Sequence, residues 1–348
     1  MARRLPIYFV IDCSVSMVGK PITDVERALS AVVGALRSDP HALETAHIGV
    51  IAFAEIGKVL VRLTGLMDFQ APTLPIGAGT NLGAGLEVLM AEIDASIIRG
   101  SPDRKGDWKP VVYLMSDGRP TGDAKQAIQK WQQNFARRAN VVGIGFGADA
   151  DLSVLRQVAL SAQGVANVFS YDPSRDADMK SFVRWISQSI STQSASLSGD
   201  RLVLASLEGD AFRPAEEVAA TVGDDRWVPV VARCGVKGTP FIAKYVAAGT
   251  PGNAGRVHAL EGMYPVAESY FEWSGPEGGR SRISTDMFGR WDTCPVCRQA
   301  DRALYAVCSC GRVFCDTGRA GRKTCPWCKL TGDYGEPDGP LDIAQGRA

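Results

Sequence analysis

The stretch Ile7-Tyr-Phe-Val-Ile-Asp12-Cys-Ser14-Val-Ser16 decides the fold of the first half of this chain. Its apolar run, 7–11, is typical of a strand that is buried on both faces of a sheet. The run ends in Asp12, Ser14 and Ser16, whose alternate spacing turns all three side chains to one side as the chain leaves the strand. We therefore expect a central strand that carries a polar site at its carboxyl end.

Further apolar runs alternate with segments whose apolar residues recur at helical spacing. We expect the other strands at 47–54, 59–63, 111–115, 141–146 and 168–171. We expect helices at 22–37, 81–98, 124–138, 152–160 and 176–191. This alternation predicts an α/β domain over residues 1–195, with a mostly parallel, Rossmann-like sheet and helices on both faces.

Two further polar loops lie where such a sheet binds ligands, beyond the carboxyl ends of its strands. One is Gly77-Ala-Gly79-Thr80-Asn81, and the other is Ser116-Asp117-Gly118. With the first strand, the loops offer the carboxylates of Asp12 and Asp117 and the hydroxyls of Ser14, Ser16 and Thr80, which suit Mg²⁺ or another octahedral divalent ion. The alternative is that these residues only cap helices and form turns.

The set Asp12-x-Ser14-x-Ser16, Thr80 and Asp117-Gly118 resembles the metal-ion-dependent adhesion site of von Willebrand factor A domains. The resemblance covers residues 1 to about 195. It implies that Ser14 and Ser16 bind the ion directly, Thr80 directly or through water, and Asp12 and Asp117 mainly through water. It also implies that Mg²⁺, or Mn²⁺ or Ca²⁺ in its place, takes its last ligand from an acidic side chain of a partner protein.

The sequence favours a binding protein over an enzyme, and we expect no catalytic residues. No G-x-x-x-x-G-K-[ST] loop is present, and none of the three histidines stands in a recognisable nucleophile arrangement. The enzymatic alternative is a metal-dependent phosphohydrolase that uses Asp12 and Asp117. It is disfavoured because Ser14 stands where aspartyl phosphotransferases usually have a second acid.

Composition points to a soluble protein of the cytoplasm. The 348 residues include 38 Lys or Arg and 38 Asp or Glu, so net charge gives no pull toward nucleic acid or an anionic membrane. The first apolar run is too short for a signal peptide, and no stretch approaches the ~20 apolar residues of a membrane span. Seven of the nine cysteines lie between Cys294 and Cys328, which in a reducing compartment predicts metal rather than disulfides.

The second half of the chain changes character. The serine-rich stretch 187–199 predicts a frayed helix end that leads into a linker, 196–225. Strand-like runs at 227–232, 240–247 and 257–271 then predict a β-rich, cysteine-rich domain over 226–335. Residues 336–348 are expected to form a tail.

The cysteine cluster predicts one or two structural zinc ions. Its ligand candidates are Cys294, Cys297, Cys308, Cys310, Cys315, Cys325 and Cys328. Two C-P-x-C turns are strong signs of a tetrahedral thiolate site, and so small a segment needs metal to fold. The simplest pairing puts the two C-P-x-C turns on one ion. The other three cysteines then need a fourth ligand, for which Cys234 is the first choice and His258 the second.

Two other interpretations of the cluster stay open. Cys310-Gly-Arg-Val-Phe-Cys315 resembles the centre of a cross-braced, RING-like finger, but Arg312 and Gly318 occupy places where ligands are expected, which disfavours a ubiquitin-ligase function. A nucleic-acid-binding zinc protein is the other. Between Cys294 and Lys329 there are seven Lys or Arg against two Asp, and zinc-bound thiolates offset most of that charge.

The whole chain resembles the TerY-like family of tellurite-resistance systems. The shared features are the opening R-R-L-P-I-Y, the segments Arg37-Ser-Asp-Pro40 and Gly106-Asp-Trp-Lys-Pro110, and a cysteine-rich module after the A domain. The resemblance implies partners, namely a PP2C-type phosphatase and a serine/threonine kinase. It implies the role of a non-enzymatic adaptor or regulator in a phosphorylation-based stress response.

Overall fold

The computed structural model divides the chain into two compact units, residues 1–75 with 79–223 and residues 76–78 with 224–348. The structure describes residues 3–101, 103, 105–117, 120, 122–147, 150–161, 163–172, 176–196, 201–207, 212–214, 227–248, 257–275, 282–288, 291, 293–299, 304–335 and 339–344.

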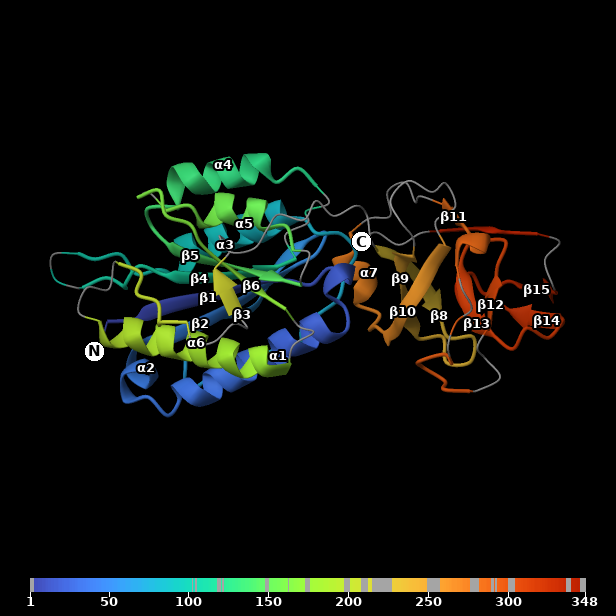
Figure 1. Cartoon of the computed structure of the whole chain (residues 1–348), viewed down its shortest axis with the longest axis horizontal. Coiled ribbons are helices and arrows are strands. Elements are labelled where there is room, and N and C mark those ends of the chain that lie inside the picture. The colour runs from blue at the N-terminus through green and yellow to red at the C-terminus, as the bar shows by residue number, and fades with distance from the viewer. Residues whose placement is uncertain are drawn as a thin grey trace. The chain divides into compact units, whose positions relative to one another are not determined.

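The first unit is built on a sheet that, in the described residues, has seven strands in the order β3-β2-β1-β4-β5-β6-β7 (Figure 1). The strands are β1 (Leu5–Asp12), β2 (Ala46–Phe53), β3 (Gly57–Gly65), β4 (Val111–Ser116), β5 (Asn140–Phe146), β6 (Asn167–Tyr171) and β7 (Phe212–Pro214). Strands β2, β1, β4, β5 and β6 pair in parallel, and β3 and β7 close the two edges antiparallel. All eight residues of β1 are buried, which explains its unbroken apolar run.

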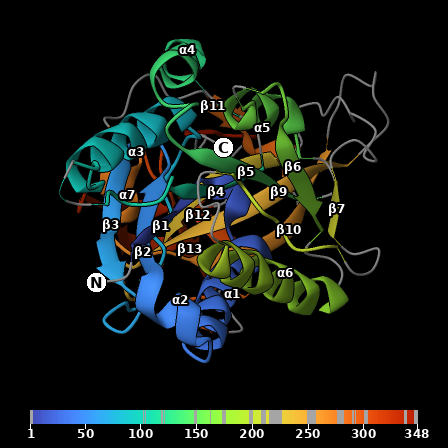
Figure 2. The same cartoon turned by 90° about the vertical axis from the view of Figure 1, so that its left-hand side faces the viewer.

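Helices cover both faces of this sheet, as Figure 2 shows. One face carries α1 (Lys20–Leu36), α2 (Pro40–Thr45) and α6 (Asp176–Ala195), and the other carries α3 (Leu82–Ser96), α4 (Lys125–Asn134) and α5 (Leu152–Ala159). The predicted α/β fold is therefore confirmed. Helix α2 was not expected; it begins at Pro40 because Asp39 caps the free N–H groups of His41 and Ala42. Within the described part of the chain, no helix is long and apolar enough to cross a membrane.

The segment from 187 to 214 corrects the expectation of a linker. Helix α6 continues through the serine-rich stretch to Ala195, where buried polar side chains hold the following chain. The Ser189 hydroxyl accepts the Ala205 N–H at 3.0 Å, and the Trp185 indole donates to the Ala205 carbonyl at 2.9 Å. With β7 paired to β6, the described parts of 196–225 belong to the first unit. A serine-rich composition therefore did not mean a free linker.

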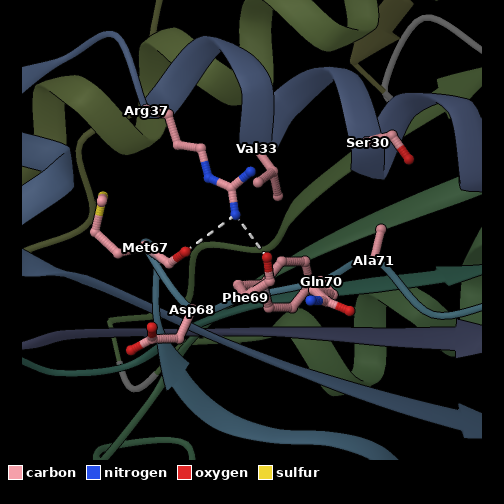
Figure 3. A pocket seen from close by; sticks show the side chains of 8 residues that line it. All are labelled: Ser30, Val33, Arg37, Met67, Asp68, Phe69, Gln70 and Ala71. Atoms are coloured by element: carbon pink, nitrogen blue, oxygen red, sulfur yellow. Dashed lines mark hydrogen bonds between the residues drawn. The ribbon is translucent and has the colours of Figure 1, made fainter.

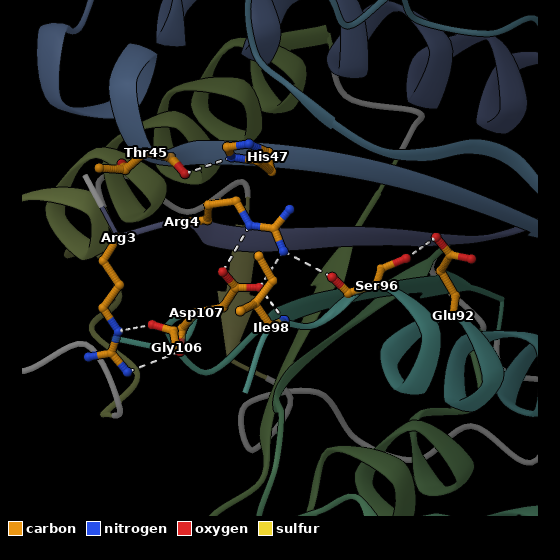
Figure 4. Close-up of polar contacts among 9 residues, drawn as sticks. All are labelled: Arg3, Arg4, Thr45, His47, Glu92, Ser96, Ile98, Gly106 and Asp107. Atoms are coloured by element: carbon orange, nitrogen blue, oxygen red, sulfur yellow. Dashed lines mark hydrogen bonds and ion pairs between the residues drawn. The ribbon is translucent and has the colours of Figure 1, made fainter. Parts of the chain in front are cut away.

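An ion pair fastens β1 to the segment that leads into β4 (Figure 4). The Arg4 guanidinium donates to both carboxylate oxygens of Asp107, at 2.8 and 2.5 Å, and to the Ser96 carbonyl at 2.9 Å. The Asp107 side chain is 3% exposed and also accepts the Ile98 N–H at 2.8 Å. A bidentate, nearly buried pair of this kind depends on both partners.

We expect Arg4→Ala to lower the free energy of unfolding of the first unit by about 2 to 3 kcal/mol, because it leaves the buried Asp107 carboxylate without its cation. Urea unfolding followed by circular dichroism measures the change. The matched control is Arg99→Ala, since the Arg99 side chain is 80% exposed and lies 3.9 Å from Asp94. The control should change stability by less than about 0.5 kcal/mol. Equal losses in the two variants would contradict the prediction.

The second unit contains, in its described residues, a five-stranded sheet in the order β10-β9-β8-β13-β12. Its strands are β8 (Trp227–Arg233), β9 (Pro240–Ala248), β10 (Val257–Pro265), β12 (Leu304–Val307) and β13 (Val313–Asp316). Two strand pairs accompany it, β11 (Arg282–Ser284) with β16 (Asp342–Ala344) and β14 (Gly321–Thr324) with β15 (Thr331–Tyr334). The predicted β-rich class is confirmed, but the strand expected at 257–271 ends at Pro265 and is followed by the short helix α7 (Tyr270–Trp273).

Candidate metal centres

Asp12 is the last residue of β1 and is completely buried. The parallel register pairs Ile11 with Met115, so Asp12 lies beside Ser116 at the end of β4. Strand β1 lies between β2 and β4. After β1 the chain adds β2 and β3 on one side of it, and then β4, β5 and β6 on the other side. This is the topological switch point, where open α/β sheets bind their ligands.

Two hydrogen bonds fix the Asp12 carboxylate. One oxygen accepts the Ser14 N–H at 2.9 Å, and the other accepts the Ser116 hydroxyl at 2.6 Å. Ser116 is a positioning residue that the sequence analysis did not single out. Its position in the sequence could have pointed to it, because Ser116 directly precedes Asp117 at the end of β4. In the parallel pairing of β1 with β4 this position lies beside Asp12.

The hydroxyls of Ser14 and Ser16 lie 2.8 Å apart at the start of the 3₁₀ turn Val15–Met17. In an octahedral shell with Mg–O distances of about 2.0 to 2.1 Å, neighbouring ligand oxygens are about 2.8 to 3.0 Å apart. The spacing of the two hydroxyls therefore fits adjacent positions around one Mg²⁺ ion.

Main-chain bonds bring the Thr80 loop to the same edge of the sheet. The Asn81 N–H donates to the Ala54 carbonyl just beyond β2, at 2.7 Å, and the Cys13 N–H donates to the Phe53 carbonyl, also at 2.7 Å. The ends of β1 and β2 and the loop are thus held together. Thr80 itself is 2% exposed, and the Asn81 side chain caps α3 by accepting the Ala84 N–H.

The electrostatics of this edge call for a cation. Burial, and then the nearby charge of Asp117, raise the pKa of the Asp12 carboxyl well above its ordinary value. Asp117 is half-buried and directly follows β4, whereas Gly118 lies outside the described residues. A divalent ion would neutralise the two carboxylates, so the residues present fit the metal that the sequence predicts. Cys13, between the two predicted ligands Asp12 and Ser14, is fully buried.

Two groups of four cysteines form the other candidate centres. The inner cysteine set is Cys234, Cys294, Cys297 and Cys315, and the outer cysteine set is Cys308, Cys310, Cys325 and Cys328. In each set all sulfur atoms lie within 4.8 Å of one another, and all nine cysteines are free of disulfides. The simplest pairing, with both C-P-x-C turns on one ion, is therefore wrong. The two sets interleave along the chain because β13 carries Cys315 back to β8.

The sulfur spacings fit zinc. A tetrahedral thiolate shell with Zn–S of about 2.3 Å has edges of about 3.8 Å. In the inner cysteine set, Cys315 lies 4.0 Å from Cys297 and 3.9 Å from Cys234, between Sγ atoms. In the outer cysteine set, the Cys308–Cys328 and Cys310–Cys325 Sγ distances are 3.6 and 4.0 Å.

A common turn explains why Cys234 joins the inner cysteine set. Its carbonyl accepts the Gly238 N–H at 2.8 Å, just as the Cys294 carbonyl accepts the N–H of Arg298 and the Cys325 carbonyl that of Lys329. The last residues of these three turns, Gly238, Arg298 and Lys329, all have a positive φ, of 72°, 56° and 64° respectively. The Cys234 turn has no second cysteine, and Cys315 fills that place, with its sulfur accepting the Gly235 N–H at 3.2 Å.

The remaining sequence candidates have other surroundings. His258 belongs to neither cysteine set in the described chain and instead lies on β10, its ring 5.9 Å from that of Phe288. Arg312, at one of the places where a RING-like finger has a ligand, lies over the Trp327 ring at 4.3 Å. Gly318, at the other, follows β13 with a φ of 74°.

A pocket lies between α1 and residues 67–71 (Figure 3). It adjoins the end of β3, and Gly65 pairs with His47 at the start of β2, whereas Asp12 pairs with Phe53 at its end. The Arg37 guanidinium donates to the main-chain carbonyls of Met67 and Phe69, at 3.4 and 2.6 Å. Arg37 thus holds residues 67–69 against the end of α1. This contact lies toward the amino ends of the parallel strands, whereas the predicted metal site lies at their carboxyl ends.

Comparison with known proteins agrees with this two-part architecture. The von Willebrand factor type A domain family model matches residues 7–184, and the TerY-C metal binding domain model matches residues 224–348. A von Willebrand factor A domain-containing protein of Dictyostelium discoideum is 26% identical over 160 residues, 44% of this chain, and the chain spans 17% of that relative's length.

Solved structures with a similar fold show low identity. A von Willebrand factor type A protein from Catenulispora acidiphila has a TM-score of 0.41 and 16% identity, covering 80% of this chain and 70% of that one. Proximal thread matrix protein 1 from the mussel byssus, with a zinc-occupied MIDAS motif, has a TM-score of 0.38 and 20% identity, covering 53% of this chain and 46% of that one. The combination of domains that the sequence predicted is confirmed by the two family matches.

Proposed function

We propose that this chain, which belongs to the von Willebrand factor type A domain family and carries a TerY-C metal-binding domain, is a non-enzymatic adaptor that binds a partner protein through a metal ion. The residues that would hold Mg²⁺ are Asp12, Ser14, Ser16, Thr80 and Asp117. When bound, the ion supplies a Lewis-acidic position that accepts a carboxylate ligand from the partner.

The observation that carries the proposal is the hydrogen-bonded arrangement around Asp12. Its two oxygens are held by the Ser14 N–H and the Ser116 hydroxyl, which orient the carboxylate toward neighbouring groups rather than toward solvent. The hydroxyls that would contact the ion directly come from Ser14 and Ser16, which carry no charge. A centre with only two protein carboxylates keeps affinity for a further anionic ligand, which an Asp or Glu side chain provides.

The same geometry disfavours the phosphohydrolase alternative. A nucleophilic aspartate must be open to the phosphorus atom of its substrate. Asp12 has 0% exposure, and each of its oxygens already accepts a hydrogen bond. We therefore assign Asp12 to orienting the ligands of the metal site rather than to chemistry on a substrate.

The second unit would serve as a zinc-folded scaffold rather than a nucleic-acid reader. Seven Lys or Arg and two Asp lie between Cys294 and Lys329. Two zinc ions, each held by four thiolates, contribute four negative charges, so the region with its metals keeps a net charge of about +1. That is a weak footprint for phosphate contacts, which depend on clustered positive charge.

We propose a PP2C-type phosphatase and a serine/threonine kinase as the partners, within a tellurite-resistance-like stress response in the cytoplasm. The support is the resemblance of nearly the whole chain to the TerY-like family, together with the TerY-C match. The metal chemistry also sets the type of partner residue. It must be an Asp or Glu whose carboxylate reaches the metal site at the carboxyl ends of the strands.

A pull-down with a PP2C-type phosphatase and a serine/threonine kinase from the same organism tests the function. We expect binding in Mg²⁺ buffer, no binding after Mg²⁺ is removed, and recovery when Mg²⁺ is returned. Asp117→Ala should abolish binding, because it removes one of the two charges that hold the ion. The matched control is Asp68→Ala. Asp68 is an exposed acid that follows β3, and it lies toward the amino ends of the parallel strands, away from the predicted metal site.

Zinc content must be checked in each sample, because chelators that remove Mg²⁺ also remove zinc. With two zinc ions still bound, binding that persists without Mg²⁺ and in Asp117→Ala would refute the adaptor proposal. Turnover of phosphoesters that disappears in Asp12→Asn would instead support the enzyme.

A further inference from the structure

The two cysteine sets have unequal surroundings. Three members of the inner cysteine set, Cys234, Cys294 and Cys315, have 0% exposure, and only Cys297 is half-buried. In the outer cysteine set Cys310 is exposed and Cys328 is half-buried. The most exposed cysteine of the two sets therefore belongs to the outer cysteine set, and a small oxidant approaches this residue without any opening of the fold.

The inner cysteine set lies in the main core of the second unit. Its three buried sulfurs pack in one cluster with Val230, Phe241 and Trp291. Cys234 is the first residue after β8, and Cys315 lies within β13. The two strands are parallel neighbours in the sheet, with Phe314 opposite Arg233. A metal ion here joins the middle strands of the five-stranded sheet.

The outer cysteine set lies at the margin of the unit. Cys308 and Cys310 stand in the turn between β12 and β13, and Cys325 and Cys328 stand in the turn between β14 and β15. Their hydrophobic cluster is small: Cys308 and Cys325 pack with Ala306 and Phe314. In the described chain, β14 and β15 pair only with each other, so a metal ion here attaches a hairpin rather than completing the sheet.

We propose that the outer cysteine set is a reversible, peroxide-sensitive zinc site, and that Cys310 is the residue oxidised first. Zinc-bound cysteines are thiolates, and susceptibility of thiolates to oxidation follows their exposure. The inner cysteine set is a permanent structural site, because three of its four cysteines are closed to solvent. This inference does not depend on partner binding at the adhesion site.

The reaction has two balanced steps. The Cys310 thiolate attacks one oxygen of hydrogen peroxide, the O–O bond breaks, and the products are a sulfenic acid and hydroxide. Cys325, whose sulfur is 4.0 Å away, then attacks the sulfenic sulfur, and a second hydroxide leaves as the disulfide forms. The peroxide gains the two electrons that the sulfurs lose. Two thiolates remain for zinc, too few to retain it, and a thiol reductant reverses the change.

Loss of this zinc would free the β14–β15 hairpin at its turn. The side chain of Trp327, between Cys325 and Cys328, donates to the Val313 carbonyl at 2.8 Å, and its ring lies 4.7 Å from the Arg233 guanidinium. Once the turn is released, the hairpin is held on β13 by these contacts, by the Lys323–Asp316 ion pair and by the packing of Tyr334 on Phe314.

Zinc release from the intact, fully loaded chain tests the proposal. Hydrogen peroxide at submillimolar concentration should release one of two zinc ions at least about tenfold faster than the other, as read by a metallochromic dye and native mass spectrometry. Mapping of alkylated thiols at the half-point should place the disulfide within the outer cysteine set. A thiol reductant with added zinc should restore two ions.

A matched pair of variants assigns the site. Cys310→His keeps a zinc ligand that peroxide does not oxidise, and the exposed position leaves room for the imidazole, so the fast release should disappear. Cys297→His makes the same exchange at the most exposed residue of the inner cysteine set, and fast release should persist. Equal release rates, first oxidation in the inner cysteine set, or fast release retained in Cys310→His would each overturn the proposal. If a variant fails to load zinc, the thiol map of the unmodified protein still decides.

Discussion

We expect Cys315→Ser to unfold the second unit while the first unit stays folded. Cys315 is fully buried, lies in β13, and has sulfur neighbours in two other segments, at Cys234 and Cys297. Structural zinc contributes about 10 to 16 kcal/mol of apparent folding free energy in small zinc-binding peptides. That range overlaps the upper part of the about 5 to 15 kcal/mol by which whole domains are stable. Weakening this ion by one ligand is therefore enough to lose the fold.

Hydrogen exchange of the full chain separates the two units. In Cys315→Ser, peptides from β8, β9 and β13 should lose protection, whereas peptides from β1 and β4 should keep it. Elemental analysis should give fewer than two zinc ions per chain. The control, Cys310→Ser, weakens the outer cysteine set and should free only the β14–β15 hairpin. Persisting protection of β8 and β9 in Cys315→Ser would show that the sheet folds without its zinc.

The second large effect concerns Asp12→Asn, which should abolish Mg²⁺ binding without unfolding the first unit. The amide has the shape of the carboxylate and can still accept the Ser14 N–H. It also removes a buried negative charge that faces Asp117, so the metal-free variant should be at least as stable as the metal-free native protein. Loss of function would then come from the lost ion and not from a damaged fold.

Thermal unfolding with and without Mg²⁺ measures this effect. At Mg²⁺ concentrations 100 times the dissociation constant, the native protein should gain about 2.7 kcal/mol, which for a unit of this size is a rise in Tm of about 5 to 10 °C. Asp12→Asn should show no rise. The control Asp68→Asn should respond to Mg²⁺ like the native protein. A Tm of Asp12→Asn that still climbs with Mg²⁺ would show that the ion lies elsewhere.

Local patterns were enough to predict most strands and helices of the first unit. Short unbroken apolar runs such as 7–11 indicate strands buried on both faces, and all eight residues of β1 are buried. The polar residues that follow such runs lie at strand ends, and parallel strands place those ends at one edge. For this reason the polar residues of the adhesion site stood out, whereas the hydrogen bond from Ser116 to Asp12 depends on the pairing of β1 with β4 and was not foreseen.

Residue composition gave a wrong prediction for the stretch after 187, because the burial of its polar side chains depends on partners farther along the chain. The serine-rich stretch after 187 predicted a frayed helix end and a linker, yet Ser189 and Gln193 are buried and bind main-chain groups of 201–205. Polar side chains can be buried when partners are available, and no local pattern in the sequence announces the partners.

The sequence by itself determined the α/β class, the loops of the adhesion site and the presence of a cysteine-rich metal module, because strand burial, helical period and C-x-x-C turns are set by residues close together in the chain. Only the tertiary structure decided which cysteines share an ion. A turn such as Cys294–Cys297 supplies two ligands at most, and the rest come from wherever the strands are paired. The neighbouring positions of β8 and β13 bring Cys234 and Cys315 together across 81 residues, and that pairing is a property of the folded sheet.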